Sequence, residues 1–477
     1  MPSSLYRQLA DHYQGAIEAG ALAAGDRMPS VRALMRTHGV SLTTALQACR
    51  HLEGEGWLEA RPRSGYFVRR RRSARVLAPA TESTATRPPD PAAYVGIHAK
   101  VSEIVARGQA APVEVNFALA VGAPELYPVD ALQRAAVRHL RRHPQTLTTM
   151  ARYHGIPELK AALAKHALTQ GMQAAPDEVI VTHGCIEALN LALRAVAKPG
   201  DTIAVESPTY YGLLQVLESL GLRALEIPTS PHTGLSLDAL AFALEHDASI
   251  RAVVAMPTMQ NPLGSTMPDD AKQRLVALCR QHDIALIEDD IYGEMSDAGT
   301  PPKAAKAWDE TGHVIYCNSL NKSLAPGLRL GWMLAGRWQA RVEMLKYAQT
   351  RYSEELPQQV AAEFVGSGAF ERHLQRLRAV LKRQRERLAE AVAEHFPAGT
   401  RLTVPPGGML LWIELPDGRS SERLFDAALA EGIKIAPGSM FSNSRRFDHF
   451  VRLSAGWPVD AAHEHAVQRV GALAKQA

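Results

Sequence analysis

The sequence predicts an α/β protein in which a small helical domain with a β-hairpin precedes a large domain built on a mostly parallel sheet. Three observations support this fold class. The chain has 477 residues, too many for one typical domain. Through most of its length, apolar runs of strand length alternate with amphipathic helices, which is typical of a three-layer α/β/α arrangement. Residues 1–72 instead show helical periodicity followed by two short strand-like runs.

The composition, 46% hydrophobic and 21% charged, is that of an ordinary globular soluble protein. No uninterrupted apolar run is long enough to span a membrane, and Arg7, Asp11 and Glu18 interrupt the start, where a signal peptide needs an apolar core. We therefore expect a cytoplasmic protein. The cysteines form no C-x-x-C pair, which argues against a disulfide framework or a zinc site and predicts reduced, mostly buried thiols at Cys49, Cys185, Cys279 and Cys317.

The charge is concentrated at one end of the chain. Net charge is +4, yet residues 1–72 alone carry +5 from 11 Arg and 6 Asp or Glu, which leaves −1 for the rest. A local basic excess of this kind indicates a polyanionic partner for the N-terminal domain.

Three helices are predicted within residues 5–54. The first carries an apolar residue every four positions, at Leu5, Leu9, Tyr13 and Ile17. Ser30 is a good N-cap for the second helix, whose inner face is Val31, Leu34 and Met35. After a turn at His38 and Gly39, Ser41 caps a third helix with a buried stripe of Ala45, Ala48, Cys49 and Leu52. This spacing is that of a helix-turn-helix, and the strand-like runs at 57–60 and 66–68 predict a hairpin wing after it.

Residues 29–68 resemble the winged helix-turn-helix of the GntR regulators in the motifs P-S-x-R, G-V-S-x-T-T, L-x-x-x-G-W and G-Y-F-V. The resemblance implies double-stranded DNA as a partner, with a recognition helix whose first turn faces base edges while hydroxyl and Arg side chains take phosphates. The DNA contacts that it implies are Arg32, Ser41, Thr43, Thr44, Arg61 and Gly65.

Positions 42 and 46, often Arg in GntR proteins, are Leu42 and Leu46 here, and neither belongs to the buried stripe. Two interpretations stay open. The leucines either pack against the other monomer or the larger domain, or they contact thymine methyl groups.

Residues 73–112 are predicted to be a linker between a domain at 1–72 and one at 113–477. Positions 73–91 are rich in Ala, Thr, Ser and Pro. The Arg run at 69–72 either touches DNA phosphates or is a solvated tether, and a short helix near 95–107 is expected to dock the linker onto the large domain.

One stretch of the large domain has the layout of a cofactor lysine. Lys322 follows Ser319 by three residues and precedes Arg329 by seven, in a Gly- and Pro-containing loop after a strand-like run. A lysine amine forms a Schiff base with an aldehyde, and a hydroxyl and a guanidinium hold a phosphate. The matching cofactor is pyridoxal 5′-phosphate (PLP). A solvated surface lysine is the alternative for this motif taken alone.

Further special residues follow the predicted strands at 179–182, 202–205, 252–255, 285–287 and 314–316, with helices predicted at 187–197, 211–220 and 271–281. Ligands of parallel sheets sit beyond the carboxyl ends of the strands. The motifs there, G-C-I, P-T-Y, Q-N-P-L-G, E-D-D-I-Y, S-x-N-K and G-x-R, resemble in this order the fold-type I aminotransferases over roughly the last 360 residues.

That resemblance assigns a role to each residue. It implies that Lys322 is the catalytic lysine that carries PLP, that Asp289 pairs with the ring nitrogen, and that Asn261 and Tyr292 hold the ring oxygen. It further implies a stacking role for Tyr210, phosphate contacts for Gly184, Cys185, Ser319 and Arg329, and a substrate or effector carboxylate for Arg452 in a smaller C-terminal subdomain. Asn321 stands where a second Ser is common. No His lies at ligand spacing beside Asp289 and Asp290, so we expect no metal.

Residues 152–159 resemble the tyrosine loop that reaches the phosphate of the neighbouring subunit in these enzymes, but the loop is shorter here, so Tyr153 is left unassigned. Because such sites are built at a subunit interface, a homodimer on paired DNA half-sites is expected.

A GntR-like winged helix joined to an aminotransferase-like domain is the architecture of the MocR subfamily of regulators. The predicted function is therefore a PLP-dependent transcriptional regulator that senses an amino acid or PLP. The alternatives are a catalytically active aminotransferase with an accessory DNA-binding domain, and a DNA-binding protein whose PLP fold has lost the cofactor and serves for dimerisation.

Overall fold

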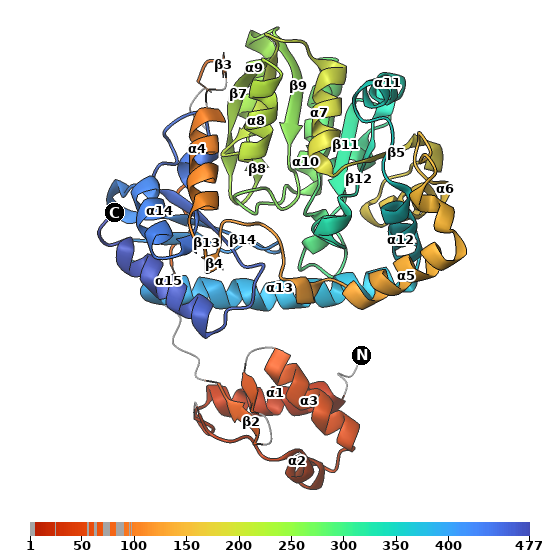
Figure 1. The fold of residues 1–477 in the computed structure, drawn as a ribbon. Coiled ribbons are helices and arrows are strands. Elements are labelled where there is room, and N and C mark those ends of the chain that lie inside the picture. Colours follow the sequence, from red (N-terminus) through yellow and green to blue (C-terminus); the bar gives the residue numbers. More distant parts are fainter. Residues whose placement is uncertain are drawn as a thin grey trace. The chain divides into compact units, whose positions relative to one another are not determined.

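The structure is a computed structural model that describes residues 5–23, 25–54, 57–61, 64–69, 77–82, 90–94, 96 and 98–477. The chain divides into two compact units, Met1–Val76 and Leu77–Ala477 (Figure 1). Each unit has a hydrophobic core of its own.

The small unit consists of three helices and an antiparallel hairpin: α1 (Leu5–Glu18), α2 (Val31–His38), α3 (Leu42–Gly54), β1 (Leu58–Arg61) and β2 (Gly65–Val68). The predicted stripe of α3 is buried together with Leu9, Leu34 and Trp57, which confirms the helix-turn-helix packing. Ser30 caps α2 by accepting a hydrogen bond from the backbone N–H of Ala33 at 3.2 Å. Leu5, assigned to the apolar stripe of α1, is instead 65% exposed, because it lies in the first turn, beyond the core.

The large unit is organised around a nine-stranded sheet. Five neighbouring strands run parallel, and one strand near the edge is antiparallel to both of its neighbours, so the expected mostly parallel sheet is confirmed. The order is β3 (Ala93–Tyr94), β7 (Arg223–Ser230), β6 (Thr202–Ser207), β9 (Ile250–Ala255), β10 (Ala285–Asp289), β11 (Val314–Ser319), β12 (Gly331–Leu334) and β5 (Val179–Thr182), with β8 (Gly234–Leu235) on β7.

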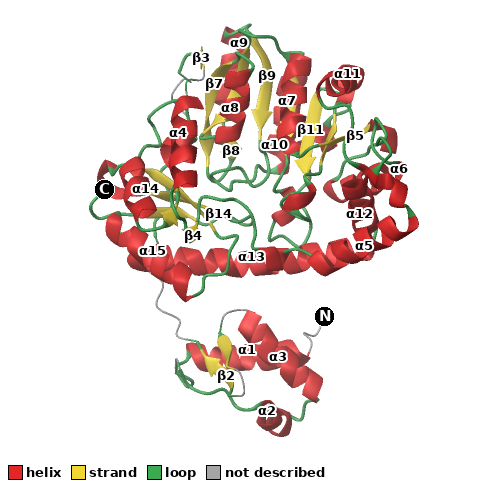
Figure 2. Cartoon of the chain, in the orientation of Figure 1, coloured by secondary structure: helices red, strands yellow, loops and turns green. Residues whose placement is uncertain are grey.

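Helices cover this sheet because alternate residues of each buried strand face opposite ways. On β6, Ile203 and Val205 pack with α7 (Cys185–Val196) and α8 (Tyr211–Ser219), whereas Ala204 packs with α9 (Leu237–His246) and α10 (Asp269–Gln281). Figure 2 shows the strands flanked by helices. Four further helices complete this part of the unit: α5 (Val129–Arg142), α6 (Pro157–Ala167), α11 (Gln339–Gln349) and α12 (Glu355–Val365).

A smaller C-terminal subdomain lies beside the large sheet, as expected. It contains an antiparallel sheet in the order β13 (Arg401–Thr403), β14 (Leu410–Glu414), β17 (Phe450–Ser454) and β16 (Ala436–Pro437). The strand β15 (Ile433–Lys434) pairs in parallel with β4 (Val115–Asn116). The helices α14 (Ser421–Ala430) and α15 (Ala461–Leu473) belong to this subdomain. The helix α13 (Gly368–His395) runs from α12 to α15 along one side of the unit (Figure 1).

Within the range predicted as linker, residues 77–82 and the helix α4 (His98–Ala110) belong to the large unit. Ala80 is buried, and its backbone N–H donates to the hydroxyl of Thr403 at 3.1 Å. Val101 and Ile104 of α4 are buried in the same core. The chain before the large sheet is therefore anchored on the C-terminal subdomain.

All four cysteines are buried and none is paired with another, in agreement with the predicted burial. In the part of the chain that the structure describes, none of the helices combines the length and the apolar character needed to cross a bilayer.

Candidate functional site

The predicted cofactor residues lie where three strands of the large sheet end. The strand β10 ends at Asp289, β11 ends at Ser319 just before the Lys322 loop, and β5 ends at Thr182 just before Gly184. These strands point the same way, because β12 is antiparallel to both β11 and β5. Their carboxyl ends therefore meet at one edge of the sheet, as expected for a ligand site of a parallel sheet.

Lys322 places a buried amine at this edge. Its Nζ donates a hydrogen bond to the backbone oxygen of Ala120 at 2.6 Å. Burial, aided by the positive charges of Arg452 and Arg329, lowers the pKa of Lys322 to about 8, although Asp289 acts in the opposite direction. More of this amine is uncharged at neutral pH than in an exposed lysine, and the uncharged amine is the form that attacks an aldehyde.

Asp289 is a buried carboxylate with one oxygen already occupied. Burial raises its pKa to about 6, against the effect of a hydrogen bond that the thiol of Cys185 donates. Cys185 Sγ and the backbone N–H of Ile291 both donate to Oδ1, each at 3.3 Å. Among the described residues, Oδ2 accepts no hydrogen bond. A buried carboxylate with one free oxygen fits a protonated ring nitrogen, which supplies the positive partner that such a group needs.

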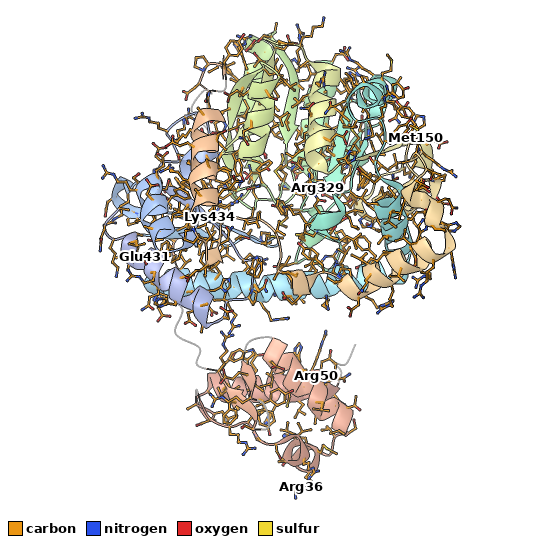
Figure 3. The ribbon with its side chains drawn as sticks, viewed as in Figure 1. Arg36, Arg50, Met150, Arg329, Glu431 and Lys434 are labelled. Atoms are coloured by element: carbon orange, nitrogen blue, oxygen red, sulfur yellow. The ribbon has the colours of Figure 1, made fainter. Side chains whose placement is uncertain are left out.

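A cradle for an anion lies at the N-terminus of α7. Gly184 has a φ of +79°, and a Cβ there would lie 3.2 Å from Asn321 Nδ2 and 3.3 Å from Arg329 Nη2. Any larger residue would crowd these donors. Arg329 lies in the middle of the large unit (Figure 3), and its Nη2 donates to the backbone oxygen of His183 only at 3.5 Å. Two side-chain donors and the N–H groups of a helix start fit a phosphate.

The hydroxyl of Ser319 holds the Lys322 loop closed. It donates to the backbone oxygen of Leu330 at 2.9 Å and accepts from the backbone N–H of Asn321 at 3.1 Å. The side-chain oxygen of Asn321 is buried and has no hydrogen-bond partner among the described residues. The phosphate contact of Ser319 stays a prediction.

Polar aromatic and amide groups surround this edge. Burial raises the pKa of Tyr210 and of Tyr292, so both phenols keep their protons and are donors at neutral pH. Asn261 is buried, and its Oδ1 accepts a hydrogen bond from Arg452 Nη1 at 3.1 Å. The structure thus brings the predicted ring contacts next to Arg452.

Arg452 on β17 is a buried cation at the same site, with only 1% of its surface exposed. Its Nη2 donates to the backbone oxygen of Ala118, and its guanidinium lies 5.1 Å from the ring centre of Phe441. Its Nε has no hydrogen-bond partner among the described residues. Because buried charges are normally paired, this guanidinium fits a carboxylate.

Tyr153 lies elsewhere in the structure. Its hydroxyl donates to the backbone oxygen of Glu343 in α11, and its ring lies 5.1 Å from that of Tyr347. Within one chain, therefore, this side chain packs on α11.

Three groups at this site were not expected from the sequence. The backbone oxygens of Ala118 and Ala120 carry no signal in a sequence, since every residue has one. Glu206, at the end of β6, accepts from the backbone N–H of Met256 at 3.0 Å and from Gln260 Nε2 at 3.3 Å. Burial raises the pKa of Glu206 to about 8. Its position before the P-T-Y motif is a signal that was available.

The predicted DNA contacts all lie in the small unit. Ser41 Oγ accepts from the backbone N–H of Thr44 at 3.1 Å and pairs with Thr44 Oγ1 at 2.9 Å, while Arg32 and Thr43 are exposed. Arg61 forms an ion pair with Glu59 at 2.6 Å and lies 4.3 Å from the ring centre of Phe67. Gly65, with a φ of +96°, opens β2. Positions 62–63 and 70–72 of the predicted wing and Arg run lie outside the described residues.

Comparison with known proteins identifies both units. Residues 5–68 match the family "Bacterial regulatory proteins, gntR family", and residues 116–470 match "Aminotransferase class I and II". The "Uncharacterized HTH-type transcriptional regulator YjiR" of Escherichia coli (strain K12) is 35% identical over 98% of this chain and 98% of its own. The "Probable rhizopine catabolism regulatory protein MocR" of Rhizobium meliloti is 28% identical over 93% of this chain and 87% of its own.

Among solved structures, the kynurenine aminotransferase of Pyrococcus horikoshii in complex with PMP has a TM-score of 0.73 at 28% identity, covering 79% of this chain and 94% of that enzyme. The chain therefore belongs to the MocR subfamily of GntR transcriptional regulators, in which a helix-turn-helix domain is joined to an aminotransferase class I and II domain.

Proposed function

We propose that this protein is a PLP-dependent transcriptional regulator whose small unit binds double-stranded DNA and whose large unit senses an amino acid or PLP itself. One observation carries the proposal. Near the carboxyl ends of the strands of the large sheet lie Lys322, Asp289 and Arg452, and the same chain contains a winged helix-turn-helix. The cofactor is pyridoxal 5′-phosphate. Because its partner is DNA, we expect the protein to act in the cytoplasm.

The residues at the strand ends divide the binding of PLP among them. Lys322 supplies the amine for the aldehyde, and Asp289 holds the proton on the ring nitrogen, where the bound ring acts as an electron sink. Asn261 and Tyr292 hold the ring oxygen, and Tyr210 stacks on the ring. The phosphate is held at the start of α7 and beside the Lys322 loop, by Gly184, Cys185, Ser319 and Arg329.

Arg452 gives the site its preference for ligands with a carboxylate. Its guanidinium is buried and its Nε lacks a partner among the described residues, so a carboxylate that enters the site gains a charge-assisted hydrogen bond without displacing another acceptor from Nε. Amino acids combine such a carboxylate with an amine that can react at the PLP aldehyde. They are therefore the effector class that this site favours.

The large unit forms a homodimer. An apolar pocket of about 590 Å³ adjoins the Lys322 loop, with Leu119, Val129, Pro326, Leu328, Leu356 and Trp457 among its lining residues. Leu119, Val129 and Trp457 are 50%, 55% and 38% exposed, a large apolar area for a monomer to leave in water. Two small units on one dimer then call for two DNA half-sites.

The DNA contacts are Arg32, Ser41, Thr43, Thr44, Arg61 and Gly65.

The alternative function, a working aminotransferase with an accessory DNA-binding domain, draws support from the lowered pKa of Lys322, which suits an amine that must react. A sensor needs only to bind its ligand, whereas an enzyme must also convert it. A ligand that binds two arrangements of the protein unequally shifts the population that binds DNA.

The deciding experiment measures both outputs on one preparation of the full chain. DNA affinity is titrated with PLP and with a panel of amino acids, and the single-turnover reaction of each amino acid with the PLP-loaded protein is followed in parallel. A regulator changes its DNA affinity with at least one of these compounds. Turnover at ordinary enzyme rates together with an unchanged DNA affinity supports the aminotransferase. A chain that binds DNA but takes up no PLP leaves only the dimerisation role for the large unit.

A further inference from the structure

We infer that the exposed face of α3 reads A·T base pairs in the major groove, with Leu42 and Leu46 against thymine methyl groups and Gln47 on the edge of adenine. The inference rests on the proposed DNA-binding function and adds to it the kind of operator that the small unit prefers.

The face in question is defined by the packing of α3. Its opposite side is buried in the core of the small unit, at Ala45, Ala48, Cys49 and Leu52. The outer side of α3 carries the residues at 42, 43, 46, 47 and 50, which are spaced three or four positions apart and therefore share one face of the helix. Leu42 is 53% exposed, Gln47 is exposed, and Leu46 is partly exposed without belonging to the core cluster. Two leucines on adjacent turns therefore present an apolar strip to the outside.

The neighbouring hydroxyls are already engaged. Ser41 Oγ accepts from the backbone N–H of Thr44 and so caps the helix, and it also pairs with the Thr44 hydroxyl, which leaves these two groups for phosphate contacts rather than for base edges. The side chain of Gln47 makes no hydrogen bond among the described residues. The groups free to meet base edges on the first two turns are thus Leu42, Leu46 and Gln47, beside the exposed Thr43.

The first two turns of α3 lack the basic side chains that most often recognise guanine. Residues 42–49 contain no Arg or Lys, and the first basic residue of α3 is Arg50. Guanine is recognised mainly by a bidentate Arg or Lys, whereas adenine pairs with Asn or Gln through N6 and N7 and thymine offers its methyl group to apolar side chains. One A·T pair shows both features in the major groove. Leucines and a glutamine on one face therefore match a run of A·T pairs.

Charge complementarity favours DNA as the occupant of this apolar strip over a second copy of the small unit. Residues 1–72 carry a net charge of +5, which opposes contact between two copies and attracts phosphates. Exposed arginines stand on α2 and α3, where Figure 3 labels Arg36 and Arg50. In a DNA complex these residues hold the backbone while the strip meets the bases.

The test begins by selecting tight-binding duplexes from random DNA with the full-length protein. We expect half-sites dominated by A·T pairs. Single thymines of a selected half-site are then replaced by uracil, which pairs identically but lacks the methyl group. Loss of one buried methyl contact is expected to weaken binding by roughly fourfold. Replacing adenine by 7-deazaadenine removes the N7 acceptor and tests Gln47 in the same way.

Three variants assign the effects to residues. L42A is expected to lose the discrimination between thymine and uracil at the one position that Leu42 contacts, while L42M, which keeps an apolar side chain of similar reach, retains the preference for thymine there. L5A removes a leucine of α1 that is 65% exposed and serves as the matched control, with unchanged discrimination. The midpoint of thermal unfolding of each variant shows whether the small unit is still folded.

The outcomes separate the two levels of the argument. Absence of binding to any duplex at low salt overturns the proposed function itself. Binding with G·C-rich selected half-sites, or with equal affinity for thymine and uracil duplexes at every position, overturns only the reading of A·T pairs.

Discussion

The thiol of Cys185, the first residue of α7, donates a hydrogen bond to Oδ1 of Asp289 at the end of β10, over 3.3 Å. The carboxylate is buried, and its pKa of about 6 lies above its ordinary value of 3.8 because burial outweighs this bond. A side chain assigned from the sequence to the phosphate therefore also contacts the group assigned to the ring nitrogen.

Replacement of Cys185 by alanine is expected to raise the pKa of Asp289 further, since the charged carboxylate loses a donor. The raised pKa means that the contribution of Asp289 to stability is complete below about pH 4 and is lost as pH rises through 6. In Cys185→Ala this loss continues to higher pH. The additional decrease in the free energy of unfolding is roughly 1 kcal/mol, the contribution of one weak hydrogen bond. Urea unfolding of the cofactor-free protein across this pH range measures it. Cys185→Ser, which keeps a donor, should follow the wild type, and identical profiles for Ala and Ser would contradict the prediction.

Lys322→Ala is expected to abolish covalent attachment of PLP while the protein stays folded, because the amine is lost but the anion cradle at Gly184 and Arg329 remains. Reduction with borohydride followed by peptide mass spectrometry locates the attachment. The wild type should yield one labelled peptide that contains Lys322, and Lys322→Ala none. A label on another lysine, or none on the wild type, speaks against the assignment.

Arg32→Ala is expected to weaken binding to all duplexes alike and to reduce the slope of log affinity against log salt by about 0.9, the share of one phosphate contact. Arg32 is exposed in the first turn of α2, where it is free to reach the backbone of DNA. Arg280→Ala, which removes an exposed arginine of α10 in the large unit, is the matched control. An unchanged salt slope for Arg32→Ala means that this side chain does not neutralise a phosphate.

Val129→Arg is expected to produce monomers, because it places a charge in the apolar pocket beside the Lys322 loop. Sedimentation gives the oligomeric state, and binding to DNA with paired half-sites should fall with it. Phe242→Arg changes a side chain of α9 that is 47% exposed outside this pocket and should remain dimeric. If Val129→Arg stays dimeric, the pocket is not the interface.

Glu206→Gln is expected to stabilise the protein at alkaline pH. Burial raises the pKa of Glu206 from 4.5 to about 8, so its contribution is complete below pH 4.5 and is lost as pH rises through 8. The full decline, on the order of 5 kcal/mol, is absent in the variant. Urea unfolding near pH 5 and near pH 9 compares the two proteins, with the exposed Glu245→Gln as control. Equal pH dependence in wild type and Glu206→Gln counts against a protonated Glu206.

Local patterns in the sequence determined the elements that depend only on neighbours along the chain. The buried stripe of α3, the cap at Ser30 and the strands β5, β6, β9, β10 and β11 follow from the spacing of apolar and capping residues. Their periodicity reports which side of an element is buried. The order of motifs at the strand ends likewise placed Lys322, Asp289 and Arg329 at one edge, because parallel strands end together.

The tertiary structure alone decided which groups meet across the chain. β7 was not predicted, since the charged and proline positions in Arg223–Ser230 hide a strand whose burial comes from its neighbours. β12 was part of a motif, yet its place between β11 and β5 depends on Gly331, where a Cβ would lie 2.5 Å from the backbone carbon of Gly184. The backbone oxygens of Ala118 and Ala120 accept hydrogen bonds from Arg452 and Lys322. Because every residue has such an oxygen, the residue type at these positions does not predict the contact. Such contacts arise from long-range packing, which a local pattern does not encode.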